Sequence, residues 1–120
     1  MTVLDASAML AYLAGEPGAD IVEAAFPGSR CSAANWSETA QKVRAKSGDW
    51  LLARALLLSQ GLIVEPVLAA DAEWAAKRWE RGEGLSLGDR LCLALGARLA
   101  EEVLTADRTW GERDGVRQIR

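Results

Sequence analysis

Four acidic residues stand out because each lies where a predicted strand ends or near the start of a predicted helix. Asp5 closes the first predicted strand, and Asp107 follows the fourth. Asp89 opens a long apolar helix, and Glu38 lies in the first turns of another helix. The carboxyl ends of parallel strands and the amino ends of the following helices share one edge of a sheet. We therefore expect these four carboxylates to lie along that edge.

Carboxylates gathered at one edge have a definite chemistry. They repel one another unless they are protonated or bridged by cations. Oxygen ligands select hard cations such as Mg²⁺ or Mn²⁺ over zinc or copper. Magnesium held by a few carboxylates and several waters is typical of phosphoryl chemistry, where it activates water and neutralises charge on the phosphate.

Each acid also has an ordinary structural interpretation. Asp5 and Asp89 are suited to capping the helices that follow them, Asp107 to a turn, and Glu38 to a solvated helix face. Taken together, these interpretations do less well. Neither capping nor a turn predicts that two strands should both end in Asp at the same edge.

The composition excludes several other kinds of catalysis. The 120 residues contain no histidine, which rules out Ser-His-Asp and Cys-His catalysis, His-ligated zinc and ribonucleases that use a histidine pair. Two cysteines are too few for a zinc cluster or a disulfide framework, and Cys92 lies in an apolar run that is typical of a core. The net charge of −3 argues against a passive nucleic-acid binder but is compatible with a metal-loaded nuclease.

The rest of the chain predicts the elements that position these acids. Predicted strands cover residues 1–5, 29–32, 62–67, 102–105 and 116–119, and predicted helices cover 6–15, 19–26, 33–46, 50–59, 70–81 and 87–100. Strands that alternate with helices predict an α/β fold with a mainly parallel sheet. The length and the lack of a linker predict one domain over residues 1–120. The lack of a signal peptide or a membrane span predicts a cytoplasmic protein.

Two helices carry more apolar surface than one core needs. The helix over residues 50–59 is apolar on several faces. Trp74 and Trp79 are five residues apart, so on one helix they cannot point the same way. Surplus apolar surface indicates an interface with another protein.

Four motifs occur in the order found in PIN-domain ribonucleases. They are Val3-Leu4-Asp5-Ala6-Ser7-Ala8, Trp36-Ser37-Glu38, Leu85-Ser86-Leu87-Gly88-Asp89 and Leu104-Thr105-Ala106-Asp107-Arg108-Thr109-Trp110. Over essentially its whole length the chain resembles these nucleases, and specifically the small VapC-type toxins of bacterial type II toxin–antitoxin pairs. The resemblance implies a three-layer α/β/α fold with a parallel five-stranded sheet in the order 3-2-1-4-5.

The resemblance also implies a site. Its catalytic and Mg²⁺- or Mn²⁺-binding residues would be Asp5, Glu38, Asp89 and Asp107. Asp5 and Asp89 are the strongest candidates for direct ligands, and the other two would act partly through water. Ser7 matches a supporting polar position beside the acids, with a helix-start role as the alternative.

Other residues are weaker candidates. Thr105 matches a second supporting polar position, with an ordinary strand-end role as the alternative. Glu112 and Asp114 are candidates for a further acid. Arg108 and Arg113 are candidates for contacts with RNA phosphates, with ordinary surface charge as the alternative.

The activity implied by the resemblance is endonucleolytic cleavage of structured RNA, such as tRNA or ribosomal RNA, by a metal-activated water. The implied partners are a cognate antitoxin and a second copy of the chain. A housekeeping RNA-processing nuclease of the same fold and a non-catalytic PIN-like binding module stay open as alternatives. A haloacid-dehalogenase-like phosphatase would need an Asp where Ser7 stands, and a receiver domain would need an Asp after the third strand, where Glu65 stands before Pro66.

Overall fold

The sheet is parallel, and its strands lie in the order β3-β2-β1-β4-β5. The strands are β1 (Thr2–Leu4), β2 (Arg30–Ser32), β3 (Ile63–Glu65), β4 (Glu102–Thr105) and β5 (Val116–Gln118). This computed structural model describes residues 1–113 and 115–120. The predicted α/β fold and the strand order implied by the resemblance are confirmed.

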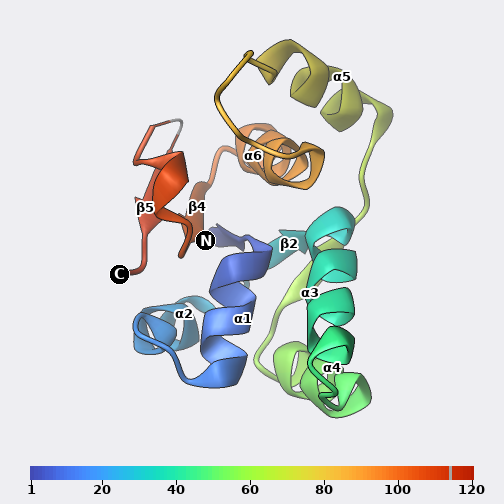
Figure 1. Cartoon of the computed structure of the whole chain (residues 1–120), viewed down its shortest axis with the longest axis vertical. Helices are drawn as coiled ribbons and strands as arrows, with labels where there is room; N and C mark the ends of the chain where they lie inside the picture. The colour runs from blue at the N-terminus through green and yellow to red at the C-terminus, as the bar shows by residue number, and fades with distance from the viewer. Residues whose placement is uncertain (114) are drawn as a thin grey trace.

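Helices cover both faces of the sheet. They are α1 (Ala6–Ala14), α2 (Ala19–Ala25), α3 (Ala33–Ala45), α4 (Trp50–Ser59), α5 (Ala69–Arg78) and α6 (Leu87–Leu99), with a short 3₁₀ turn, η1 (Arg108–Trp110), after β4. Figure 1 shows α5 and α6 together on one side of the strands and α1 to α4 on the other side. The three-layer arrangement is therefore confirmed.

The central strands are buried on both faces, since successive side chains of a strand point to opposite layers. Leu4 and Leu104 pack into the cluster that contains Met9 of α1. Val3 and Val103 pack into a second cluster, with side chains of α6. This alternation holds β1 and β4 in the middle of the molecule, so the residues that follow these two strands emerge at the centre of one sheet edge.

The ends of α5 and the surface of α4 add detail that the sequence pattern lacked. The predicted helix 70–81 ends at Arg78, because the backbone of Trp79 turns to an extended conformation (φ −58°, ψ 135°). Trp79 is 53% exposed, whereas Trp74 packs against the second cluster. On α4, Leu51 and Leu52 are 72% and 66% exposed, which agrees with the predicted surplus of apolar surface.

None of the helices that the structure describes is both long enough and apolar enough to cross a lipid bilayer.

Candidate active site

Asp5 follows β1 directly, caps α1 and is 3% exposed. Its Oδ1 accepts hydrogen bonds from the backbone N–H of Ala8 at 2.8 Å and the hydroxyl of Ser7 at 2.7 Å. Its Oδ2 accepts a hydrogen bond from the hydroxyl of Thr105 at 2.5 Å. The ordinary capping role therefore holds for this residue, but the two hydroxyls also fix the carboxylate beyond what a cap requires.

The register between β1 and β4 explains why Thr105 reaches Asp5. Leu4 pairs with Leu104, and the backbone N–H of Asp5 donates to the Leu104 carbonyl at 3.2 Å. The residue beside Asp5 on β4 is therefore Thr105, and Asp107 lies two residues further along the chain. Thr105 Oγ1 also accepts a hydrogen bond from the backbone N–H of Asp107 at 3.0 Å.

Ser7 completes this junction between α1 and the end of β4. Its hydroxyl bonds Asp5 and accepts a hydrogen bond from the backbone N–H of Ala106 at 2.8 Å. It also lies 3.1 Å from the hydroxyl of Thr105. The structure thus brings both predicted supporting residues, Ser7 and Thr105, onto Asp5.

Burial raises the pKa of Asp5 from its usual 3.8 to about 6. The hydrogen bonds from Thr105, Ala8 and Ser7 lower this pKa, and the nearby charge of Asp89 raises it. Burial outweighs the hydrogen bonds, so the ionised form is costly in the absence of a cation.

Asp89 is the third residue of α6 and forms a reciprocal cap with Ser86. The Asp89 N–H donates to Ser86 Oγ at 3.1 Å, and the Ser86 N–H donates to Asp89 Oδ2 at 2.9 Å. The Asp89 carboxylate therefore lies at the positive end of the α6 dipole.

Glu38 lies on α3, one turn after Asn35, which donates its side-chain N–H to Glu38 Oε1 at 3.2 Å. The charges of Asp5, Asp89 and Glu38 all raise the pKa of the Cys92 thiol, which burial already raises well above its usual range. Cys92 lies on α6 and is fully buried. Three acids from three separate elements therefore act on one buried point.

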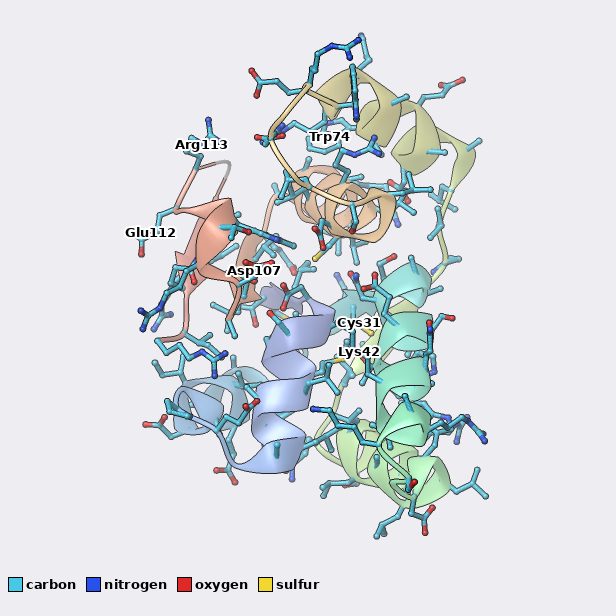
Figure 2. All side chains as sticks on the ribbon, viewed as in Figure 1. Cys31, Lys42, Trp74, Asp107, Glu112 and Arg113 are labelled. Atoms are coloured by element: carbon cyan, nitrogen blue, oxygen red, sulfur yellow. The ribbon has the colours of Figure 1, made fainter. Side chains whose placement is uncertain are left out.

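Asp107 lies in the turn that follows β4 (Figure 2). Its Oδ1 accepts hydrogen bonds from the N–H of Thr109 at 3.0 Å and the Thr109 hydroxyl at 2.7 Å, which caps η1. Over residues 1–113 and 115–120, no three acidic, cysteine or histidine side chains come close enough together to hold a metal ion. The acids face one region without forming a compact ligand cluster.

The donor chemistry at this edge nevertheless fits a hard divalent cation. The candidate ligands are carboxylate oxygens, and Asp5 is a buried carboxylate whose pKa is raised by desolvation. A cation near Asp5 would offset that cost. The residues that would hold it are Asp5, Asp89 and Glu38. Asp107 would join them from the turn after β4.

The weaker candidates lie on the segment after β4. Arg113 donates to Glu83 Oε2 at 3.1 Å, and Glu83 also accepts hydrogen bonds from Arg78 at 2.7 and 2.9 Å. The hydrogen bond from Arg78 is the main reason that the pKa of Glu83 is lowered. Figure 2 shows Arg113 beside Glu112, which is exposed. Glu83 thus links the loop before α6 to the segment before β5.

Arg108 and Asp114 are the two remaining candidates on this segment. Arg108 is exposed at the start of η1. Asp114, the other candidate for a further acid, lies outside the described residues.

Sequence reasoning missed Asn35 and Glu83. Asn35 is 1% exposed, and an Asn three residues before Glu on a predicted helix is a signal that could have found it. Glu83 joins Arg113 across 30 positions of sequence, so no local pattern indicates the pair.

The PIN domain family model matches residues 2–116. A structure described as a toxin–antitoxin complex from Klebsiella pneumoniae is similar with a TM-score of 0.82 and 18% identity, over 100% of this chain and 98% of that chain. VapC20 from Mycobacterium tuberculosis, described as a toxin that cleaves the sarcin–ricin loop, is similar with a TM-score of 0.70 and 23% identity, over 88% of each chain.

At these identities the two structures establish a shared fold. A search of curated proteins finds no match. The family model covers nearly the whole sequence and includes all four acids. The chain therefore belongs to the PIN domain family.

Proposed function

We propose that the chain is a divalent-metal-dependent endoribonuclease and the toxin of a toxin–antitoxin pair. The proposal rests on two features: Asp5 is buried and hydrogen-bonded by Ser7 and Thr105, and the Asn35 amide joins Glu38 to the first turn of α6, where Asp89 lies. These acids come from the end of β1, the start of α6 and the middle of α3. Three acids from neighbouring elements would suit a single cation-binding site between the layers of the fold.

In this proposal each side chain has a distinct task. Asp5 is the rigid ligand, because Ser7 and Thr105 hold its carboxylate. Asp89 is the second direct ligand, and Glu38 and Asp107 act partly through water. A Mg²⁺ or Mn²⁺ ion held by these residues would lower the pKa of a bound water, which favours its deprotonation to a nucleophile, and would offset negative charge on the phosphodiester.

The proposed substrate is structured RNA, such as tRNA or ribosomal RNA. The sarcin–ricin loop, which the description of VapC20 gives as its target, is one structured RNA of this kind. Arg108 is exposed directly after Asp107, where its guanidinium can meet a backbone phosphate. No histidine is present to serve as acid or base, so the chemistry would come from carboxylates, hydroxyls, Arg and Lys, or a bound metal ion, and the proposal takes the metal ion.

The proposed partners are an antitoxin and a second copy of the chain, in the cytoplasm. The apolar side of α4 supports a protein partner, since Leu51 and Leu52 are largely exposed. A groove of about 380 Å³ lies beside it, lined by residues of α1, α3 and α4 that include Leu10, Leu13 and Leu56. The toxin–antitoxin complex among the similar structures also supports an antitoxin.

The decisive experiment is cleavage of a total cellular RNA pool by the purified chain. The reaction is run with Mg²⁺ or Mn²⁺, with EDTA, and with Asp89→Asn. We expect discrete fragments that require both the metal and Asp89, and end-mapping of these fragments identifies the target. Fragments that persist in EDTA, or with Asp89→Asn, would contradict the proposal.

A second experiment separates a toxin from a housekeeping nuclease. Induced expression of the wild-type chain in a bacterial host should stop growth, and expression of Asp89→Asn should not. Co-expression of the small neighbouring gene should restore growth. Unimpaired growth with active enzyme in the cell would favour the housekeeping role.

A further inference from the structure

Asn35 is a buried side chain whose hydrogen bonds join two layers of the site. Its Nδ2 donates to Glu38 Oε1 at 3.2 Å and to the carbonyl of Gly88 at 3.3 Å. Gly88 lies in the first turn of α6, directly before Asp89. One amide therefore ties Glu38 on α3 to the helix start that carries Asp89.

The surroundings of Asn35 argue against a role in packing alone. It is 1% exposed, and its Oδ1 has no hydrogen-bond partner within the described part of the chain. An unpartnered buried oxygen destabilises a fold, and an apolar residue of the same size would avoid that cost. A polar residue at this position is explained by the two hydrogen bonds that its Nδ2 donates, to Glu38 and to the Gly88 carbonyl.

Gly88 is the second half of the arrangement. A Cβ at position 88 would overlap Glu38 Oε1 and lie 3.0 Å from Glu38 Cδ. The backbone of Gly88 is helical, so its conformation does not demand glycine, and alanine is ordinarily the better helix former. The missing side chain is explained by the carboxylate that occupies its place.

We infer that Asn35 and Gly88 are positioning residues that fix the carboxylate of Glu38 against the first turn of α6. The inference rests on the proposed function, because it assigns Glu38 its place relative to Asp89 in the nuclease site. The cap between Ser86 and Asp89 holds the start of α6. The contact of Glu38 with that turn then sets the distance between the two acids.

The central test is Gly88→Ala. The atom that the new methyl group meets first is the end of a flexible side chain, so Glu38 can swing away at little cost in stability. We expect the urea unfolding midpoint to stay near that of the wild type, kcat for RNA cleavage to fall at least tenfold, and KM to change little. In a Glu38→Ala background, Gly88→Ala should have no further effect on kcat.

Gly96→Ala is the matched control on the same helix. A Cβ at Gly96 would lie 2.6 Å from Val103 Cγ2, in the core and away from the acids. This variant should lose stability, keep the kcat of the folded protein, and act additively with Glu38→Ala. Asn35→Leu, which keeps the volume but removes the donor, should lower kcat as Gly88→Ala does.

A spectroscopic readout is independent of RNA and of metal. Asn35 is the sole asparagine of the chain, beside three glutamines, so ¹⁵N labelling of asparagine side chains alone gives one identifiable pair of amide signals. These signals should move to new positions in Gly88→Ala and in Glu38→Ala, and less in Gly96→Ala. Unchanged Asn35 signals in Gly88→Ala, or wild-type cleavage by it, would overturn the inference.

The two proposals can fail separately. If the wild-type chain cleaves no RNA, the proposed function fails, while the Asn35 signals still decide whether Asn35 and Gly88 hold Glu38. If the wild type cleaves RNA and Gly88→Ala cleaves it equally well, the function stands and the positioning role is overturned.

Discussion

Asp5 and Asp107 follow two neighbouring strands of one sheet, yet their surroundings differ. Asp5 is 3% exposed, and its carboxylate accepts hydrogen bonds from Ser7, Thr105 and a backbone N–H. Asp107 is partly exposed, and its carboxylate bonds to Thr109 within its own turn. The two residues emerge at the same edge, but one is held by the core and the other by a local turn.

Strand register decides which of the two acids is buried. Leu4 pairs with Leu104, so the residue beside Asp5 is Thr105, and Asp107 lies beyond the buried layer. Burial raises the pKa of Asp5, whereas a surface turn leaves a carboxylate close to water. We interpret Asp5 as the preorganised member of the site and Asp107 as the adaptable one.

The largest expected effect is that of Asp5→Asn. Loss of a fixed, charged ligand should lower the initial rate of RNA cleavage by about a thousandfold or more, because the bound cation contributes several kcal/mol. The metal-free variant should be no less stable than the wild type at pH 7, since a neutral amide avoids the cost of burying a charge. Cleavage rates and urea unfolding measure the two quantities. Cleavage within tenfold of the wild type would contradict the role of Asp5 as a metal ligand.

The pH dependence of stability gives the next largest effect. The pKa of Asp5 is raised in the folded state, so the folded protein holds this proton more tightly than the unfolded chain does. The stabilisation is therefore present below pH about 4 and lost as the pH rises through about 6. The shift from 3.8 to about 6 corresponds to about 3 kcal/mol.

Urea unfolding of the metal-free protein across this pH range measures the effect. Asp5→Asn should lose the part of the pH dependence of the unfolding free energy that comes from Asp5, and Asp107→Asn should keep it. Equal slopes in the wild type and Asp5→Asn would show that the two acids do not differ as their surroundings indicate.

Asp107→Asn should have a smaller effect than Asp5→Asn. We expect cleavage to fall by about a hundredfold, in the range seen when one charge-stabilising group is removed from an active site. Stability should change by less than about 0.5 kcal/mol, because Asn also accepts the capping hydrogen bond from Thr109. Initial rates and unfolding curves at pH 7 measure both. Retained wild-type cleavage would exclude Asp107 from the site.

The smallest expected effect is that of Thr105→Val. The change removes the hydroxyl that donates to Asp5 and accepts from the Asp107 N–H, so it should cost about 1–2 kcal/mol of stability and about tenfold in cleavage rate. It should also raise the pKa of Asp5 further. Ser29→Ala is the control, because Ser29 is fully buried before β2, at the opposite end of the strands from the acids, and its hydroxyl has no hydrogen-bond partner within the described residues. Equal losses of cleavage in the two variants would mean that Thr105 acts through packing alone.

The sequence sufficed for the fold and for the edge at which the acids lie. Alternating strands and helices predicted the α/β class, and the four motifs implied the strand order. Tertiary details escaped it for physical reasons. The place of Thr105 beside Asp5 depends on register, and the pair of Glu83 and Arg113 joins distant segments. The predicted helix 70–81 ran too far, because nothing local to Trp79 indicates that its backbone becomes extended.

The detailed arrangement of the four acids also could not be predicted from the sequence. The resemblance implied one four-acid metal site, which stays a prediction; the structure adds that Asn35 joins Glu38 to the first turn of α6 and that Asp107 caps the turn after β4. Capping patterns alone do not distinguish one arrangement of these acids from another. Asp5, Asp89 and Asp107 all cap the element that follows them or contribute to its cap.

Binding of a divalent cation by these acids can be measured with Mn²⁺ in the absence of RNA. Titration of the wild-type chain at pH 7, followed by electron paramagnetic resonance of free Mn²⁺, should show saturable binding. Asp5→Asn and Asp89→Asn should weaken this binding at least tenfold, and Glu73→Gln, at an exposed position of α5, should leave it unchanged. Equal Mn²⁺ binding by all four proteins, or no saturable binding by the wild type, would contradict a metal site at these acids.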